Sequence, residues 1–167
     1  MERWYVVQTQ ARSEELARRN LERQNFRTYL PVYSRRHRHA RRVAHVRRPL
    51  FPRYLFVAMD IELTRWRAIQ STIGVSQLVC FGSQPAPLPA GIVEAIVERE
   101  NAEGIVDTES VNKLKPGDKI QVLAGALIDR IGMLLDLADD ERVIVLLDLL
   151  GRPVKVKLPS DLVGAHS

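Results

Sequence analysis

The spacing of apolar residues in the first hundred positions changes repeatedly between the period of a strand and that of a helix. The β-branched and aromatic run RWYVVQT at 3–9 predicts a short strand. Three further runs of this kind predict strands at 26–34 (FRTYLPVYS), 50–60 (LFPRYLFVAMD) and 75–81 (VSQLVCF). This part of the chain is therefore expected to contain a sheet.

Helical patterns lie between these strands. Ser13 before Glu14 and Glu15 is a typical helix start and predicts a helix over about 14–25. A short helix is predicted at 62–72 (ELTRWRAIQST). Pro89 opens a third helix, and its apolar face consists of Ile92, Val93, Ile96 and Val97.

The pattern changes after residue 100. Residues 101–114 have weak periodicity and polar punctuation, which is typical of a linker. From 115 to 167, short apolar runs joined by turn signals (KPGDKIQVL, GMLLDL, RVIVLLDLL, PVKVKL) predict four or five short strands. So many strands in so short a segment favour a small closed barrel, because closure removes exposed sheet edges. We therefore predict two domains, 1–100 and 115–167.

The charge divides at the same place. Residues 1–100 carry 17 arginines, no lysine and 9 acidic residues, whereas residues 101–167 carry 8 basic and 11 acidic residues. The densest positive charge lies at 35–48 (RRHRHARRVAHVRR), directly before the predicted strand at 50–60. A basic first part is suited to nucleic acid, and a slightly acidic second part is suited to a protein partner.

Composition sets the remaining limits. The chain has 167 residues, 46% of them hydrophobic and 27% charged, which is ordinary for a globular protein with a real core. No apolar run approaches the roughly 20 residues that span a bilayer, and MERWYVVQTQ lacks the regions of a signal peptide. The single Cys80 fits a reducing compartment and an apolar strand position. A cytoplasmic protein without a membrane partner is the expectation.

Four motifs follow one another along the chain: WYVVQT at 4–9, LFPRYLFV at 50–57, STIGVSQLVCFG at 71–82 and PGDKIQVLAG at 116–125. In this order and spacing they resemble the NusG family of transcription elongation factors. FGSQPAPLP at 81–89 and VIVLLDLLGRPVKV at 143–156 resemble the specialised RfaH-type members more than the housekeeping ones. The resemblance covers essentially the whole chain. It implies an α+β fold, with an N-terminal NGN domain (an antiparallel sheet flanked by helices) and a C-terminal SH3-like β-barrel, the KOW domain.

The resemblance also implies a function. Such factors dock on the clamp helices of RNA polymerase, suppress pausing or termination, and link the complex to a second partner through the KOW domain. The docking surface is built around the LFPRYLFV strand, and the implied contact residues are Phe51, Tyr54, Phe56 and Ile96. Strand alternation places Tyr54 and Phe56 on one face and Leu55 and Val57 on the other. The alternative is that all of these residues belong to the core.

Two basic features are candidates for contact with nucleic acid, either the non-template DNA strand or nascent RNA. The arginine-rich segment contributes Arg35, Arg36, Arg38, Arg41 and Arg42, and its alternative reading is a solvated loop. The first helix and the turn near residue 72 contribute a second set by resemblance: Arg12, Arg18, Arg19, Asn20, Arg23, Gln24 and Thr72.

This second set departs from the RfaH-type pattern. Those members carry a Lys-Arg pair where this chain has Gln10 and Ala11, and an arginine where it has Ile73. Base contacts specify a sequence, whereas phosphate contacts only position the protein. We therefore expect a general attraction to single-stranded DNA without recognition of the same pause element.

The KOW loop departs from its family pattern as well. In GALIDRIG (125–132) the outer glycines, Gly125 and Gly132, remain, and Asp129 replaces the middle one. The outer glycines are expected to make the tight backbone turn. In the family this loop meets Rho or a small-subunit ribosomal protein, so the partner of this KOW domain stays open between them.

RfaH itself can hold this C-terminal region as an α-helical hairpin, and this is the alternative to the barrel. Gly151 and Pro153 would break a helix over 143–155. Arg48 and Arg142 occupy the positions of an acid–base pair that supports the helical form, and two arginines would repel. A five-stranded barrel is therefore predicted.

Enzymatic sites find little support. The sequence has no phosphate-binding glycine loop and neither a CxxC nor an HExxH motif. His37, His39 and His45 lie among arginines that would repel a metal cation, so neither a metal nor a cofactor is expected. The leading reading is a monomeric, non-enzymatic factor. A ribosome-associated RNA-binding KOW protein and a nucleic-acid-processing enzyme are the two rivals.

Overall fold

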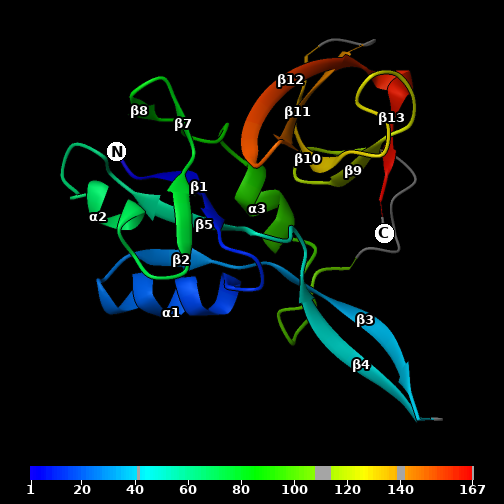
Figure 1. Ribbon diagram of the computed structural model, residues 1–167, viewed down its shortest axis with the longest axis horizontal. Helices are drawn as coiled ribbons and strands as arrows, with labels where there is room; N and C mark the ends of the chain where they lie inside the picture. Colours follow the sequence, from blue (N-terminus) through cyan, green and yellow to red (C-terminus); the bar gives the residue numbers. More distant parts are fainter. Residues whose placement is uncertain (41, 108–113, 139–141, 167) are drawn as a thin grey trace. The chain divides into compact units, whose positions relative to one another are not determined.

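A computed structural model describes residues 1–40, 42–107, 114–138 and 142–166, without the side chains of 35–39 and 43. The chain forms two compact units (Figure 1). The first comprises Met1–Leu88 and Glu100–Val106, and the second comprises Pro89–Arg99 and Asp107–Ser167. Both the predicted α+β first part and the predicted all-β C-terminal region are confirmed.

The first unit is built on an antiparallel sheet in the order β2–β5–β1–β6. Its strands are β1 (Arg3–Thr9), β2 (Arg27–Tyr29), β5 (Tyr54–Met59) and β6 (Val75–Leu78). The helices α1 (Glu14–Arg23) and α2 (Arg67–Gln70) pack on one face of this sheet and form one core with it. The core includes Leu21 from α1, Ile69 from α2, and Leu55 and Val57 from β5. The predicted alternation of β5 is therefore confirmed for its inward face.

Two predicted strands are shorter than expected because prolines interrupt them. The segment 26–34 is divided at Leu30 and Pro31 into β2 and the beginning of β3 (Val32–His39). The segment 50–60 becomes a strand only at Tyr54, because Pro52 cannot donate a ladder hydrogen bond. Arg53 takes a left-handed conformation with φ 71°, and its N–H donates to Glu14 at 2.9 Å. This hydrogen bond therefore ties the turn before β5 to the start of α1.

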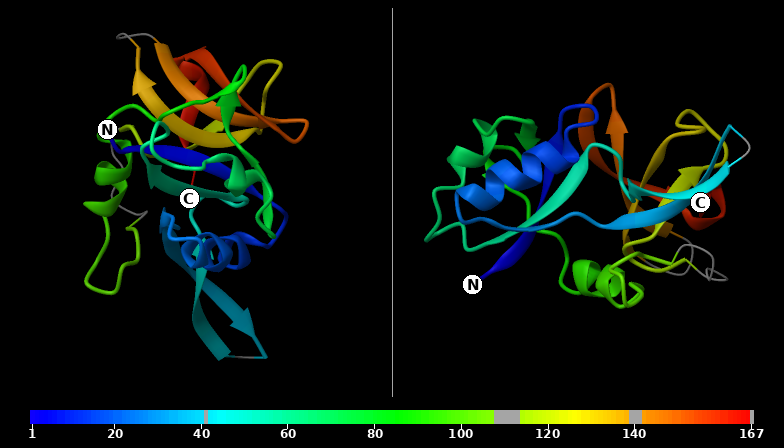
Figure 2. Two further views of the ribbon diagram at one scale, coloured as in Figure 1. Left: turned by 90° about the vertical axis from the view of Figure 1, so that its left-hand side faces the viewer. Right: turned by 90° about the horizontal axis from the view of Figure 1, so that it is seen from below.

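The arginine-rich segment is a β-hairpin. Strand β3 pairs antiparallel with β4 (Arg42–Pro49) in continuous register from Val32 opposite Pro49 to His39 opposite Arg42. The hairpin extends away from the sheet of the first unit in two perpendicular views (Figures 1 and 2). The segment is therefore a paired ribbon and not an irregular loop.

The segment 75–81 also ends early, with β7 (Cys80–Phe81) separated from β6 and paired to β8 (Gln84–Pro85). The predicted third helix begins later than Pro89, since Gly91 at its N-cap has φ 91°. The helix α3 (Ile92–Val97) buries Ile92, Val93 and Ile96 as predicted, but Val97 is 45% exposed and does not belong to the buried face. It groups with the second unit.

The rest of the second unit is a sheet in the order β12–β11–β10–β9–β13. Its strands are β9 (Lys119–Val122), β10 (Ile131–Leu137), β11 (Arg142–Leu149), β12 (Arg152–Pro159) and β13 (Val163–Ala165), with a 3-10 turn at Ser160–Leu162. Gly151 lies in the β11–β12 turn with φ 78°. The helical-hairpin alternative is therefore not the structure of this region.

Among the described residues, no helix reaches the length and apolar character needed to cross a membrane.

Candidate functional site

A row of aromatic side chains lies on the face of the first sheet that α1 and α2 do not cover. Trp4 meets Tyr29 edge-on at 6.4 Å between ring centroids, and Tyr29 stacks on Phe56 at 6.2 Å. Phe51 meets Phe56 edge-on at 6.2 Å. Strand pairing produces this row, because Tyr29 and Val6 are the register partners of Phe56. We call these four residues the aromatic row.

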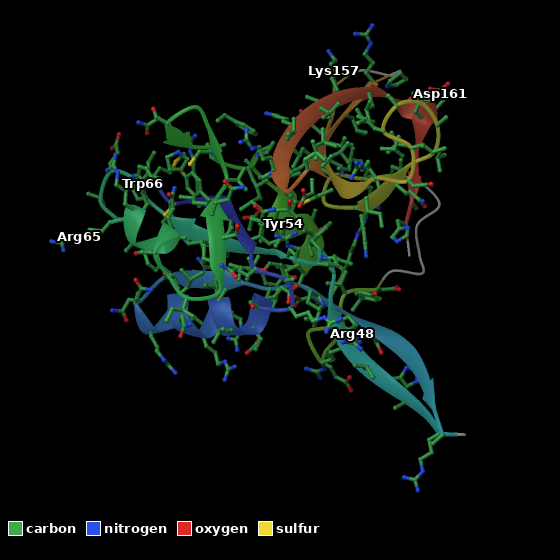
Figure 3. The ribbon with its side chains drawn as sticks, viewed as in Figure 1. Arg48, Tyr54, Arg65, Trp66, Lys157 and Asp161 are labelled. Carbon is green, nitrogen blue, oxygen red and sulfur yellow. The ribbon has the colours of Figure 1, made fainter. Side chains whose placement is uncertain are left out.

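The row has buried and accessible members. Phe56 is fully buried and Phe51 is 5% exposed, whereas Trp4, Tyr29 and Tyr54 are half-buried. Tyr54, which Figure 3 labels, is not a member of the row but lies opposite Gln8 on the same face of the sheet. A partner approaching this face would meet Tyr54, Tyr29 and Trp4, and Phe56 would support them from below.

Tyr29 also carries a polar contact. Its hydroxyl donates to the carboxylate of Glu100 at 2.5 Å. Burial of the ring raises the pKa of Tyr29, and this hydrogen bond and the negative charge of Glu100 raise it further. The guanidinium of Arg27 lies over Trp4 at 5.3 Å from the ring centroid, a cation–π contact. Polar contacts thus hold two neighbouring members of the row, Trp4 and Tyr29.

The fourth docking candidate, Ile96, belongs to the second unit. Ile96 is 1% exposed on α3, in the second unit. A β-carbon on Gly117 would come within 2.9 Å of its Cγ1 atom, so the helix packs closely on that turn. The structure brings Phe51 into edge-on contact with Phe56, and Tyr54 lies on the same strand as Phe56.

The arginines of the first helix are not equivalent. Arg18 forms ion pairs with Glu15 and with Glu22, the latter at 2.9 Å. The hydrogen bond to Arg18 lowers the pKa of Glu15. Arg12 precedes α1 in a left-handed conformation, whereas Arg19 and Arg23 lie on the helix and are exposed. The charge of Arg18 is offset, so these two are the better candidates for phosphate contact.

The remaining helix candidates bind the 72–74 turn. Gln24 donates to the Thr72 hydroxyl at 2.8 Å, and that hydroxyl donates to the Ala68 carbonyl at 2.9 Å. Asn20 donates to the Ile73 carbonyl at 2.9 Å. Thr72 is 7% exposed, whereas Ile73 is 75% exposed. These contacts fix the turn against α1 and present Ile73, rather than Thr72, to solvent.

The turn also needs a glycine. A β-carbon on Gly74 would come within 2.9 Å of the Ala17 backbone nitrogen, and Gly74 has φ 97°. A side chain here would push the turn away from α1 and break the two amide contacts.

The hairpin holds the other basic candidates. Arg35, Arg36 and Arg38 lie on β3, and Arg42 is exposed at the start of β4. The predicted candidate Arg41 falls outside the described residues. Arg47 and Arg48 are exposed on β4, and Arg48 marks the base of the hairpin in Figure 3.

The KOW-type loop has the predicted left-handed glycine at one end only. Gly125 has φ 90° and Asp129 has φ 68°, so an aspartate adopts a conformation that favours glycine. Gly132 has no positive φ, and the reason for a glycine there is different. A β-carbon on it would come within 2.2 Å of the Leu146 carbonyl oxygen on β11. The expectation of a turn glycine is therefore wrong for Gly132, which permits close strand pairing.

No cluster of side chains suited to a metal ion occurs among the residues that the structure describes. The acidic residues Asp139, Asp140 and Glu141 lie outside those residues. The chemistry that the described site offers is recognition: an aromatic face, exposed arginines and a basic hairpin.

Two members of the aromatic row, Trp4 and Tyr29, were missed by the sequence interpretation. Alternation along β1 places Trp4 on the same face as Val6, so that signal was present. Tyr29 required the register between β2 and β5, which no local pattern contains.

Comparisons with known proteins identify a family for this chain. Residues 2–97 match the family model described as "Transcription termination factor nusG". A Thermus thermophilus protein named "Transcription termination/antitermination protein NusG" is 28% identical over 93% of this chain and 94% of its own length. A Deinococcus radiodurans protein of the same name is 31% identical over 68% of this chain and 66% of its own length.

Solved structures are similar as well. The structure titled "Domain interaction in Thermotoga maritima NusG" aligns over 100% of this chain and 98% of its own, with 22% identity and a TM-score of 0.46.

Proposed function

Because the chain belongs to the NusG family of transcription termination/antitermination factors, which are not enzymes, we propose that it docks on RNA polymerase through the aromatic row and modulates pausing or termination. The observation that carries this proposal is the row itself, Trp4–Tyr29–Phe56–Phe51, on the sheet face opposite α1 and α2. Amphipathic aromatic side chains are the residues that protein interfaces favour. The clamp helices are the proposed polymerase element, and the cytoplasm is the proposed compartment.

The structure decides how this proposal is best tested. Replacing both Tyr54 and Phe56 with alanine would open a cavity, because Phe56 is fully buried. Phenylalanine-to-alanine changes in a core cost about 3–5 kcal/mol. Tyr54→Ala alone keeps the core intact and removes a half-buried ring from the proposed interface.

The experiment measures the affinity of the full chain for core RNA polymerase by pull-down and titration. We expect Tyr54→Ala to weaken binding at least about tenfold, as removal of an interface aromatic costs about 1.4 kcal/mol or more. Phe81→Ala is the matched control, since Phe81 is a 46% exposed aromatic on β7 and is not a member of the row. Equal affinity of Tyr54→Ala and the wild-type chain would reject the docking surface.

Two further assignments belong to this proposal. Exposed Arg19 and Arg23 would attract the non-template strand or nascent RNA, with the Asn20–Ile73 and Gln24–Thr72 contacts holding the adjacent turn. The loop around Asp129, with Ile128 52% exposed beside it, would meet the second partner, Rho or a small-subunit ribosomal protein. Domain boundaries at 1–100, 101–114 and 115–167 remain part of the same proposal.

We also propose a specialised, RfaH-type role rather than a housekeeping one. The support is the altered KOW loop and the arginine-rich hairpin, while the relatives described above carry the name NusG. A housekeeping factor would act on purified polymerase at unrelated templates. A specialised factor would act only where a DNA element recruits it, so transcription of several templates with this protein added separates the two.

A further inference from the structure

The β3–β4 hairpin is a free-standing two-stranded ribbon. Its two eight-residue strands would span about 26 Å at the usual rise of about 3.3 Å per residue. Its base is anchored by two backbone bonds, from Leu50 N–H to the Pro31 carbonyl at 2.8 Å and from Val106 N–H to the Val32 carbonyl at 2.8 Å. Farther out, Ala44 and His45 are exposed. The ribbon therefore offers two faces to a partner.

Both faces carry positive charge. Residues opposite one another in an antiparallel pair share a face, and positions two apart along a strand share it too. Arg36, Arg38 and Arg47 therefore occupy one face, with Ser34 opposite Arg47 and Arg36 opposite His45.

The other face carries the same number of arginines. Arg35, Arg42 and Arg48 occupy it, with Tyr33 opposite Arg48 and His39 opposite Arg42. The chain contains no acidic residue from Arg23 to Met59, so nothing within the ribbon offsets this charge. A ribbon lying on a flat anionic surface needs charge on one face only. Charge on both faces fits a slot with anionic walls on either side.

We propose that this hairpin binds B-form double-stranded DNA by lying in the major groove. That groove is about 12 Å wide and admits a two-stranded β-ribbon, and phosphates line both of its edges. Arginines on one face then contact one backbone, and arginines on the other face contact the opposite backbone. Phosphate contacts of this kind give affinity with little sequence preference.

Other nucleic acids fit the ribbon less well. Proteins that bind single strands stack the bases on aromatic side chains, and the ribbon has a single aromatic residue, Tyr33, at its base. A-form RNA has a deep, narrow major groove that does not admit such an element. The charge pattern and the composition together favour duplex DNA.

This inference does not rest on polymerase docking, and its test contains no polymerase. The full chain is titrated, by fluorescence anisotropy, against a 24-base-pair DNA duplex, one of its single strands and the duplex RNA of the same sequence, at several salt concentrations. Two triple variants remove equal charge from the two faces: Arg36→Ser, Arg38→Ser and Arg47→Ser, or Arg35→Ser, Arg42→Ser and Arg48→Ser. The matched control is Arg3→Ser, Arg65→Ser and Arg152→Ser, three exposed arginines outside the hairpin and the first helix (Figure 3 labels Arg65).

We expect the wild-type chain to bind the DNA duplex more tightly than the single strand or the duplex RNA. Each face variant should lose at least about tenfold in affinity for the duplex, and the slope of log K against log salt should flatten by up to about 2.7. The control variant should keep most of the affinity for the duplex and most of the salt dependence. Tryptophan fluorescence on heating checks that each variant is folded.

Three results would overturn the inference. One is a loss confined to a single face variant, which would mean binding to a flat surface. Another is equal or tighter binding of the single strand or the duplex RNA. The third is an equal loss of affinity in the control variant, which would mean that the hairpin contributes only to the general positive charge of the protein.

Discussion

At the scale of single residues, Tyr29 joins two parts of the first unit. Its ring stacks on Phe56 in the aromatic row, and its hydroxyl binds Glu100, which begins the returning segment 100–106. That segment ends in Val106, which is 3% exposed and donates to Val32. The proposed docking face and the exit toward the linker are therefore connected through one phenol.

We expect Tyr29→Phe to lower the free energy of unfolding of the first unit by about 1–2 kcal/mol, since the ring stack stays and a half-buried hydrogen bond is lost. The pKa of Tyr29 is raised in the folded state, so its contribution is fully present below the unfolded pKa of 10 and is lost as pH rises above it. Above pH 10, the free energy of unfolding of the wild-type chain should therefore fall more steeply than that of the variant, by up to about 1.4 kcal/mol per pH unit.

Urea unfolding at pH 8 to 11, followed by tryptophan fluorescence, measures this, because both tryptophans, Trp4 and Trp66, lie in the first unit. Burial raises the pKa of Tyr5 as well, and that effect is common to both proteins. Parallel pH profiles for the variant and the wild-type chain would contradict the role assigned to the hydroxyl.

A second residue-scale prediction concerns Gly132. Its missing side chain allows β10 to approach β11, where a β-carbon would lie 2.2 Å from the Leu146 carbonyl oxygen and 2.6 Å from Leu147 Cδ2. Gly132→Ala should therefore destabilise the second unit by about 2–3 kcal/mol, as over-packing does. Gly164→Ala on β13 is the matched control, because its nearest contact would be the exposed side chain of Leu123 at 3.2 Å. Calorimetric melting of the two variants should separate them, and equal melting temperatures would refute the packing argument.

At the scale of elements, the sequence predicted which segments form strands and helices better than where they begin. Strand β1 has the predicted limits, Arg3–Thr9, because its β-branched run is uninterrupted. The start of β5 was predicted too early because Pro52 and the left-handed Arg53 form a turn. The contacts of Asn20 and Gln24 with residues 72 and 73 could not be predicted, since they join positions 53 and 48 apart in sequence.

The helix α3 provides the element-scale prediction. Arg99, just after it, forms an ion pair with Asp118, which is 3% exposed and also accepts the Lys115 N–H at 2.6 Å. Removing one partner of a buried pair leaves an uncompensated charge, so Arg99→Met should destabilise the second unit by about 2–3 kcal/mol. The double change Arg99→Met with Asp118→Leu should recover part of that loss.

Arg130→Met is the control, because it removes an exposed arginine from the same unit. A double-mutant cycle by calorimetry isolates the interaction between Arg99 and Asp118. A coupling free energy near zero would show that α3 does not depend on this pair.

At the scale of the whole molecule, the two compact units do not follow the predicted domain limits. The change in composition near residue 100 predicted a cut there, but Glu100–Val106 groups with the first unit and Pro89–Arg99 with the second. The chain thus passes between the units three times in this region. Composition could not reveal this exchange, because it depends on backbone pairing. Val32 pairs with Ile105, which is far away in the sequence, and Glu100 pairs with Val106 within one turn.

The exchange predicts how fragments behave. A fragment of residues 1–100 lacks Val106, whose burial is worth about 1.5–3 kcal/mol, and the Val106–Val32 hydrogen bond. Fragment 1–107 retains both, and each fragment carries α3 without its partners Gly117 and Asp118. The difference in stability between the fragments therefore isolates the segment 101–107.

We expect 1–107 to be more stable than 1–100 by about 2–4 kcal/mol in urea unfolding followed by tryptophan fluorescence. Val106→Ser in the longer fragment is the control, because it keeps the chain length and the backbone hydrogen bond but removes most of the apolar burial. That variant should unfold at a urea concentration between those of the two fragments. Equal stability of 1–100 and 1–107 would mean that residues 101–107 only connect the two units, and that the predicted boundary at residue 100 is the physical one.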